Sequence, residues 1–458
     1  MAEFDAIIVG AGQAGPSLAG RLTTAGWTVA LVERKLFGGT CVNTGYAPAR
    51  ALVASAHAAH LNRRAEDFGV VPSIAVTMDM RRVKQRMQDV VVKSRDGIER
   101  SLRGMARCTV YKGTAHFVSP TELQVGDNVL SAPHIFLNVG ARPTIPKLSG
   151  VDTVPYLTSS TILELDTLPP SLVVVGGSYV GLEFAQMYRR FGSEVTVIER
   201  GSRLIAHEDE DVAKTVQDIL EAEGIRVRLN AECISLRSDG DDVVVDIDCV
   251  DDEPQVAASH ILLAMGRTPN TDDLGLKAAG ITVDEDGYIP VDDQLRTAAP
   301  GIWALGDCNG RGGFTHTAYN DFEIIAANLL DDDARKVSDR IPAHALYIDP
   351  PLAQAGLTER QVRLRGRPAL IGTRSMTTVS RALEKGETQA FIKVLVDAES
   401  KEILGASILG TGSDEAIHCI LTAMYDSKPA SLLQRSMHIN PRVAELIPTV
   451  LGSLRPLV

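Results

Sequence analysis

The chain reads AIIVGAGQAG over residues 6–15, an apolar run of four residues that leads into a turn rich in glycine. Consecutive apolar residues are typical of a strand buried on both faces of a parallel sheet, and a helical pattern follows over residues 17–25. Gly10 permits the tight turn, Gly12 lets a pyrophosphate approach the backbone, and Gly15 lets the helix pack closely on the strand. This order of strand, glycine turn and helix predicts a dinucleotide-binding unit.

An acidic residue, Glu33, follows the next predicted strand, residues 28–32. A carboxylate at this place in a dinucleotide-binding unit accepts hydrogen bonds from a ribose hydroxyl. A lone glycine pattern arises often by chance. The strand before this one and the correctly spaced acid after it make the pattern specific.

The same construction returns at LVVVGGSYVG, residues 172–181, which holds Gly176 and Gly181 at the corresponding places. Ser178 stands where the second glycine would be. Its side chain is small, so we expect a slightly more distant pyrophosphate and not the loss of the site. A helix is predicted over residues 182–190.

The two units also share their spacing. A second predicted strand, residues 194–198, ends at Glu199, and the interval from Gly176 to Glu199 equals the interval from Gly10 to Glu33. The sequence therefore predicts two dinucleotide sites in one chain.

The composition is that of an ordinary globular protein, with 458 residues of which 45% are hydrophobic and 23% charged. This length predicts about three domains. A net charge of -12 disfavours nucleic acid and anionic membranes as partners, because both would repel the chain. The six cysteines form no CxxC pair and no metal-ligand spacing, which indicates neither a disulfide framework nor a metal site. Without a signal-type segment or a long apolar run, we expect a cytoplasmic protein that does not enter a membrane.

A further stretch, GGTCVNTGYAPAR over residues 38–50, resembles the active-site loop of the FAD-dependent pyridine nucleotide-disulfide oxidoreductases, which include mercuric reductase and dihydrolipoamide dehydrogenase. The resemblance implies that Gly39 and Thr40 contact the FAD. In that family one cysteine exchanges with the substrate disulfide, and a second, five positions later, carries electrons to the flavin. Cys41 matches the first cysteine, but Tyr46 stands at the place of the second. A relay through mixed disulfides needs two sulfurs, so we expect no such relay here.

The resemblance also assigns the two cofactors. The segment TAAPGIWALGD, residues 297–307, looks like the family's second FAD-contacting motif, in which an aspartate, here Asp307 after Gly306, holds the flavin ribityl chain. Segments that begin at Gly140 and Gly266 resemble the family's crossovers between its two nucleotide domains. The first unit is therefore expected to bind FAD and the second NAD(P)H.

The implied architecture is an α/β fold with two Rossmann-type domains and a C-terminal α+β dimerisation domain. We expect a discontinuous FAD domain, residues 1–146 and 270–335, with the NAD(P) domain inserted at residues 147–269. Residues 336–458 resemble the family's interface domain, through which two subunits complete each other's active sites. The resemblance therefore implies a homodimer.

The C-terminal segment HINPRVAE, residues 438–445, departs from the family pattern. In the family a histidine next to the proline supplies, from the partner subunit, the base for the exchanging thiol, and a glutamate at the place of Glu445 holds that histidine. Here Asn440 stands at the position of the base, and an amide does not titrate in the useful range. His438 is a candidate for a displaced base, although a lone histidine near a dimer surface is more often a structural hydrogen bonder.

The residues that serve electron transfer from NAD(P)H to the flavin resemble those of active members of the family. Arg50 resembles the family's lysine near the flavin N5, and Glu183 is the acid that would pair with it. Arginine keeps the charge of that lysine but will not act as a proton donor. Tyr179 matches the aromatic gate over the flavin that moves aside for the nicotinamide.

We therefore expect an FAD-dependent NAD(P)H oxidoreductase that passes electrons from reduced flavin directly to a small acceptor. Glu199 favours NADH because a carboxylate repels a 2′-phosphate, while Arg200 and Arg203 nearby act against that preference. The alternatives are a pyridine nucleotide transhydrogenase, an NAD-linked flavin dehydrogenase of an organic substrate, and a non-catalytic redox-sensing flavoprotein. The sequence does not name the acceptor.

Overall fold

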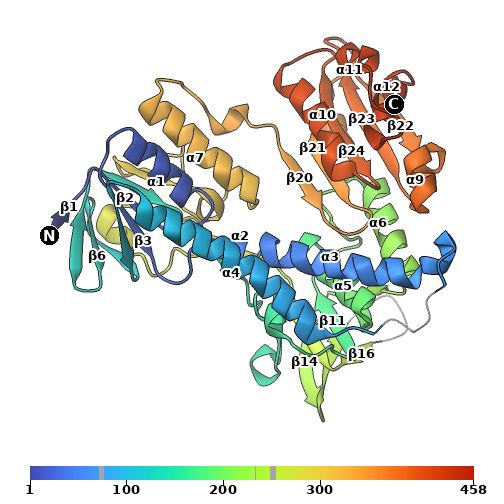
Figure 1. Cartoon of the computed structure of the whole chain (residues 1–458), viewed down its shortest axis with the longest axis horizontal. Coiled ribbons are helices and arrows are strands. Elements are labelled where there is room, and N and C mark those ends of the chain that lie inside the picture. Colours follow the sequence, from blue (N-terminus) through green and yellow to red (C-terminus); the bar gives the residue numbers. More distant parts are fainter. Residues whose placement is uncertain (72–76, 233, 248–253, 458) are drawn as a thin grey trace.

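The computed structural model describes residues 1–71, 77–232, 234–247 and 254–457. Figure 1 shows three parts that each contain a sheet, around β2, β11 and β23. Two long helices, α3 (Tyr46–Arg63) and α4 (Met80–Gly104), lie against each other and extend from the first part to the second. Among the helices of the described residues, none has the length and apolar character needed to cross a membrane.

The first part is built on a parallel sheet with strand order β19-β8-β2-β3-β4. Side chains alternate between the two faces of a strand, and both faces of β2 are covered. Ile8 packs in the cluster formed with α1 and α7, whereas Ile7 packs in the cluster formed with a second, four-stranded sheet of order β1-β7-β6-β5. This double burial is the reason why β2 reads as a continuous apolar run. The elements are β1 (Ala2–Glu3), β2 (Ala6–Val9), α1 (Gly15–Thr24), β3 (Val29–Glu33), α2 (Gly39–Asn43), β4 (Cys108–Lys112), β5 (Ala115–Ser119), β6 (Glu122–Val125), β7 (Asn128–Ser131), β8 (His134–Leu137), β19 (Ile302–Ala304) and α7 (Thr315–Leu330).

The second part repeats the parallel arrangement, with strand order β10-β17-β11-β12-β13. Its helix α5 packs on β11 and β12, and a three-stranded antiparallel sheet, β14-β15-β16, adjoins it. The elements are β10 (Leu157–Thr158), β11 (Ser171–Val175), α5 (Tyr179–Phe191), β12 (Glu194–Ile198), α6 (Glu210–Ala222), β13 (Arg226–Arg228), β14 (Ile234–Asp239), β15 (Asp242–Ile247), β16 (Gln255–Ala258) and β17 (His260–Leu263).

The chain leaves the first part and returns to it. Strand β19 pairs with β8 of the first sheet although the whole second part lies between them in the sequence. At the two crossings, β9 (Ala141–Pro143) pairs antiparallel with β18 (Arg267–Pro269). The residue limits of the three predicted domains stay predictions.

The third part is a six-stranded antiparallel sheet with strand order β20-β21-β24-β23-β22-β25. Helix α10 packs on β21 and β24, and Figure 1 shows the other short helices around the same sheet. The elements are β20 (Ala343–Leu346), β21 (Leu352–Gly356), α8 (Glu359–Arg365), β22 (Ala369–Ser375), α9 (Ser380–Lys385), β23 (Phe391–Asp397), β24 (Ile403–Leu409), α10 (Ser413–Tyr425), α11 (Ser431–Arg435), α12 (Ile447–Leu451) and β25 (Arg455–Pro456).

Both helices that follow the glycine turns begin earlier than the apolar pattern predicts. Helix α1 begins at Gly15 instead of residue 17, and α5 begins at Tyr179 instead of residue 182. The first turn of α1 holds Gly15, Pro16 and Ser17, and that of α5 holds Gly181 and the exposed Val180, so neither turn shows the buried apolar period of the rest of its helix. Pro16 fits the first turn of α1, where its missing N–H has no helical partner to lose.

A buried ion-pair network holds the second and third parts to α3. Arg190 of α5 donates two hydrogen bonds to the carboxylate of Glu223, at 2.8 and 2.6 Å. It also donates to the Asp349 carboxylate at 2.6 Å and to the Asp349 backbone oxygen at 3.2 Å. The Nδ1 atom of His57 lies 2.5 Å from the same Asp349 carboxylate. The hydrogen bond to Asp349 raises the pKa of His57, against the opposing effect of burial.

This network makes stability depend on pH. Because folding raises the pKa of His57 above its unfolded value of about 6.5, the His57–Asp349 contact stabilises fully below that pH and is lost as the pH rises through the folded pKa. We predict that the Tm of the wild-type holoprotein, followed by flavin fluorescence, falls more steeply above about pH 6.5 than the Tm of His57→Gln. His116→Gln is the control and should keep the wild-type slope, because the Nδ1 of His116 lies 3.2 Å from a neutral backbone oxygen, that of Asp273, and not beside a carboxylate. Equal slopes for His57→Gln and the wild type would contradict this assignment.

Candidate functional site

The first glycine turn, residues 10–15, packs tightly against the backbone that follows β8. A Cβ atom at Gly10 would lie 2.2 Å from the backbone oxygen of Asn138, and one at Gly15 would lie 2.2 Å from the backbone oxygen of Gly10. No side chain fits at either position. The side chain of Asn138 accepts a hydrogen bond from Gly15 N at 3.0 Å and donates one to Leu305 O at 3.2 Å. Sequence reasoning missed Asn138, whose only signal is a polar residue directly after a buried strand.

The acid that ends each nucleotide-binding motif also binds the glycine turn itself. Glu33 accepts hydrogen bonds from Ala11 N at 2.8 Å and Lys35 N at 2.7 Å. Glu199 accepts them from Gly177 N and Gly201 N, both at 2.7 Å. Each carboxylate oxygen retains acceptor capacity for a ribose hydroxyl. The sequence predicts that each acid binds a ribose hydroxyl. The structure shows that each acid also holds its glycine turn in place.

The second turn has the geometry of the first. A Cβ atom at Gly176 would lie 2.4 Å from the backbone oxygen of Ala264, and one at Gly181 would lie 2.1 Å from the backbone oxygen of Gly176. Ser178 is extended and exposed, so its side chain does not fill the turn. The arrangement leaves the backbone open to a pyrophosphate at both sites.

The loop that carries Cys41 lies directly on the first glycine turn. Gly38 N donates a hydrogen bond to Ala11 O at 2.8 Å, and a Cβ atom at Gly39 would lie 2.9 Å from the Cα of Gly12. Gly39 has a φ of +58°, which favours glycine. Two glycine segments therefore approach each other without an intervening side chain, and they bring Cys41 to the dinucleotide site.

Cys41 is a partly buried thiol. Its sulfur lies 3.4 Å from Gln13 Oε1 and 3.4 Å from the hydroxyl of Thr315, the first residue of α7. Burial raises the pKa of this thiol, and the hydrogen bond from Thr315 offsets that effect only in part.

Tyr46 is the first residue of α3 and is 52% exposed. The described cysteines, Cys41, Cys108, Cys308 and Cys419, are all free. Cys233 lies outside the described residues, as does Cys249. No sulfur of the described residues is therefore bonded to Cys41.

Arg50 and Glu183 meet between α3 and α5. The Nη2 atom of Arg50 lies 2.9 and 3.1 Å from the two carboxylate oxygens of Glu183. The guanidinium carbon also lies 3.6 Å from the centre of the Tyr347 ring, and Tyr347 N donates to Glu183 at 2.9 Å. Nη1 of Arg50 is buried and has no hydrogen-bond partner among the described residues. Sequence reasoning missed Tyr347, whose role depends on a contact between distant segments.

Asp307 stands at the first turn after β19, beside Arg267. Arg267 Nε lies 3.4 Å from the Asp307 carboxylate, and burial raises the pKa of that carboxyl despite this partner. Arg267 also donates to Thr40 Oγ1 at 3.5 Å, so it links Asp307 to the loop that holds Cys41.

Three further glycines from the sequence analysis border this region. Gly140 and Gly266 lie beside the β9–β18 ladder, where Asn270 N donates to Gly140 O and Thr144 N donates to Gly266 O. Gly306 N donates to the buried Asp321 at 2.8 Å.

Tyr179 begins α5, four residues before Glu183. Its hydroxyl donates to Glu208 Oε1 at 2.6 Å and lies 3.1 Å from His344 Nε2. Neither Glu208 nor His344 has a motif in the sequence. Both come from segments far from Tyr179, and only the fold brings them there.

The C-terminal residues do not reach Cys41 within one chain. No hydrogen bond or ion pair of the described residues joins His438 or Asn440 to Cys41 or Tyr46, and Glu445 accepts a hydrogen bond from Arg442 N at 3.4 Å. The Nε2 atom of His438 is buried and has no partner among the described residues.

The described residues fit a bound flavin dinucleotide. The glycine turn and Gly39 leave a cradle that any Cβ atom would fill. Arg50 offers a buried N–H group without a partner, and Asp307 offers a carboxylate for hydroxyl groups. A hydrogen-bond acceptor for the ribityl chain and a hydrogen-bond donor for the polar flavin ring are thus in place.

Comparison with known proteins agrees with this geometry. The sequence pattern of the pyridine nucleotide-disulphide oxidoreductase family matches residues 4–321, and that of the family's dimerisation domain matches residues 342–451. The chain is 34% identical to the probable pyridine nucleotide-disulfide oxidoreductase RclA of Escherichia coli K12, over 97% of this chain and 98% of that protein. It is 32% identical to a mercuric reductase of Streptomyces lividans, over 97% of this chain and 94% of the reductase.

A solved structure gives the same result. The Cu(II) complex of the HOCl-induced flavoprotein disulfide reductase RclA from Escherichia coli superposes with a TM-score of 0.90 at 32% identity, covering 99% of both chains. The predicted α/β fold with a dimerisation domain is confirmed. The chain belongs to the pyridine nucleotide-disulphide oxidoreductase family and is an FAD-dependent enzyme that uses NAD(P)H.

Proposed function

We propose that this enzyme passes electrons from NAD(P)H through FAD directly to a small acceptor, without a disulfide relay. The observation that carries the proposal is Tyr46, which holds the position of the second sulfur at the start of α3. Arg50 follows four residues later on the same helix, so the Tyr46 ring and the guanidinium lie on one face. A phenol cannot form the mixed disulfide that a relay requires.

The state of Cys41 supports the same conclusion. Its raised pKa keeps the group a thiol near neutral pH, whereas thiol–disulfide exchange needs the thiolate. Its neighbours, Gln13 and Thr315, carry no charge that would stabilise a thiolate. Cys41 is therefore proposed to line the acceptor site as a weak hydrogen-bond donor.

Bound FAD would supply the chemistry that no side chain has, accepting a hydride from nicotinamide and giving up electrons to the acceptor. Arg50 places a permanent positive charge at the site, and its free Nη1–H is available to a developing negative charge. Because a guanidinium does not release its proton, protons for the acceptor must come from another group or from water. Tyr179 is proposed to cover the nicotinamide side until a nucleotide arrives.

A homodimer is part of the proposal. The segment around His438 displays Met437, which is 99% exposed, and Ile439, which is 80% exposed. Apolar side chains this exposed are suited to a subunit interface. In a dimer of the family type, His438 and Asn440 of the second subunit would face Cys41 and Tyr46 and close the acceptor site.

The preferred nucleotide is proposed to be NADH. Glu199 is already held by two backbone N–H groups, so its carboxylate is fixed where a 2′-phosphate would lie. Arg203 donates to the backbone oxygen of Ala206, which commits part of its guanidinium elsewhere.

The proposal is tested by reducing the holoprotein with NADH under anaerobic conditions and mixing it with a set of acceptors. The acceptors are a benzoquinone, glutathione disulfide, the nicotinamide analogue thio-NAD+, and Cu(II), because a solved relative holds that ion. We expect a benzoquinone or Cu(II) to reoxidise the flavin and glutathione disulfide to leave it reduced. Rapid reoxidation by the disulfide would contradict the proposal, and reoxidation by thio-NAD+ alone would favour transhydrogenation.

A second prediction concerns the two positions that depart from the family pattern. Tyr46→Cys alone should remain near background in glutathione or lipoamide disulfide reduction, because Asn440 leaves the thiol without a base. Tyr46→Cys combined with Asn440→His should gain about 10²–10⁴-fold in rate, the usual contribution of general base catalysis. Tyr46→Ala with Asn440→His is the matched control and lacks the second sulfur. Full disulfide reductase activity in Tyr46→Cys alone would show that Asn440 is not limiting.

A third prediction concerns the choice of nucleotide. Glu199→Gln removes the charge but keeps one acceptor for the turn and the ribose, so the ratio of kcat/KM for NADH over NADPH should fall by roughly tenfold. Glu33→Gln, the equivalent change in the first unit, should affect FAD retention and leave that ratio unchanged. An unaltered ratio in Glu199→Gln would assign the preference to Arg200 and Arg203.

A further inference from the structure

A buried polar cluster lies beside the candidate site and joins the second and third parts of the chain. Its members are Tyr179 at the start of α5, Glu208 just before α6 and His344 on β20. The side chain of Glu208 is 1% exposed, and its Oε1 atom lies 2.6 Å from both the Tyr179 hydroxyl and His344 Nε2. Its Oε2 atom is buried without a partner among the described residues.

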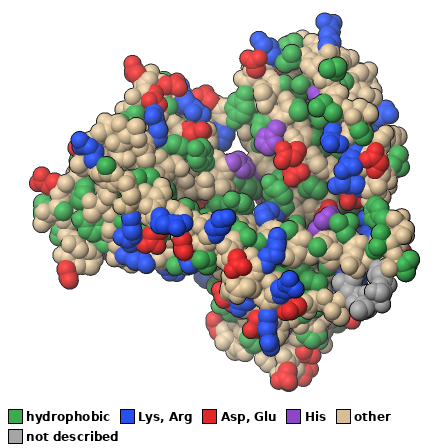
Figure 2. All heavy atoms as spheres, viewed as in Figure 1, with side chains coloured by type: hydrophobic (Ala, Val, Ile, Leu, Met, Phe, Trp, Pro, Cys, Tyr) green, Lys and Arg blue, Asp and Glu red, His purple; other side chains and the backbone are tan. Residues whose placement is uncertain are grey.

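An aromatic ring connects this cluster to the site of Cys41. Phe314 packs edge to face on Tyr179 at 6.2 Å and stacks on His344 at 5.7 Å. The next residue, Thr315, is the one that contacts the Cys41 sulfur. Figure 2 shows histidine side chains gathered at the hollow between the first and third parts of the molecule.

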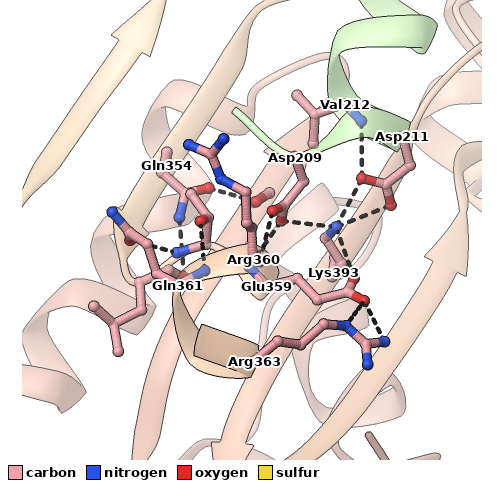
Figure 3. A network of polar contacts seen from close by, with 12 residues as sticks. Asp209, Asp211, Val212, Gln354, Glu359, Arg360, Gln361, Arg363 and Lys393 are labelled. Carbon is pink, nitrogen blue, oxygen red and sulfur yellow. Dashed lines mark hydrogen bonds and ion pairs between the residues drawn. The ribbon is translucent and has the colours of Figure 1, made fainter. Parts of the chain in front are cut away.

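The segment that carries Glu208 is fixed from its other side as well. Asp209 accepts hydrogen bonds from Glu359 N at 2.9 Å and Arg360 N at 3.0 Å, and it forms an ion pair with Lys393 at 3.0 Å. Lys393 is 1% exposed and also pairs with Asp211 at 2.7 Å. Figure 3 shows the carboxylates of Asp209, Asp211 and Glu359 converging on the Lys393 ammonium. These contacts anchor the backbone next to Glu208, so the backbone there is held in place if the Tyr179 ring swings away.

We propose that Glu208 and His344 are positioning residues that hold Tyr179 in its closed position, so that a pyridine nucleotide reaches the flavin only after the Tyr179–Glu208 hydrogen bond breaks. The inference rests on the proposed function, in which Tyr179 covers the nicotinamide side. When the Tyr179 hydroxyl moves away, Glu208 keeps His344 as its partner, so the buried carboxylate retains a hydrogen bond. The bond then sets the fraction of molecules that are open, and the apparent Kd for NADH is the intrinsic Kd divided by that fraction.

The test is anaerobic stopped-flow reduction of the bound flavin by NADH, which separates the apparent Kd from the limiting rate. Tyr179→Phe keeps the ring and removes the hydrogen bond, so its apparent Kd should fall roughly tenfold, a larger change than that of the limiting rate. Glu208→Gln should lower the apparent Kd by a smaller factor, because a neutral amide is a weaker acceptor than a carboxylate. Since both substitutions act on the same hydrogen bond, the decrease in apparent Kd in the double variant should not exceed the decrease in Tyr179→Phe alone.

The matched control is Tyr188→Phe, which removes a hydroxyl from the same helix that donates to Ile162 O instead. It should keep the wild-type apparent Kd. The inference is overturned if Tyr179→Phe behaves like Tyr188→Phe, or if the effects of Tyr179→Phe and Glu208→Gln simply add. If neither NADH nor NADPH reduces the wild-type flavin, the proposed function itself fails and the inference fails with it.

Discussion

The candidate site depends on one steric constraint, the close approach of backbone to backbone at the first glycine turn. Gly10 lies against Asn138, Gly15 against Gly10, and Gly39 against Gly12, at distances that leave no room for a Cβ atom. This contact has two consequences. It leaves backbone N–H groups of the turn free to face a pyrophosphate, and it places the Cys41 loop directly on the same turn. A side chain at Gly39 would push the Cys41 loop away from the glycine turn, and one at Gly10 or Gly15 would distort the turn itself.

The rest of the site is assembled by contacts between the three parts of the chain. Helix α5 of the second part meets α3 through the Arg50–Glu183 pair and meets the start of the third part through Tyr347 and His344. Buried ion pairs with few alternatives favour one relative placement of the parts, because a charge left unpaired in the interior is costly. The same placement brings Tyr179, Phe314 and Cys41 into one neighbourhood, although they belong to different elements.

Much of the fold and part of the candidate site could be predicted from the sequence. What could not be predicted has a physical reason. Strands β2 and β12 and both glycine turns follow from short-range rules, since apolar runs and missing side chains act locally. The starts of α1 and α5 were predicted two and three residues too late, because their first turns lack the buried apolar period of the rest of each helix. Asn138, Glu208, His344 and Tyr347 were also missed. Each acts through a partner far away in the sequence, and no local pattern records such a contact.

We propose that the flavin is the only redox-active group in each subunit. This proposal is tested most directly by anaerobic titration of the purified holoprotein with dithionite, followed by absorbance. We predict full reduction after about two electrons per FAD, without a long-wavelength charge-transfer band, because no thiolate lies at position 46 and the pKa of Cys41 is raised. Uptake of about four electrons per FAD would contradict the account, because it requires a reducible disulfide besides the flavin. A persistent charge-transfer band at half reduction would also contradict it, because such a band requires a thiolate beside the flavin.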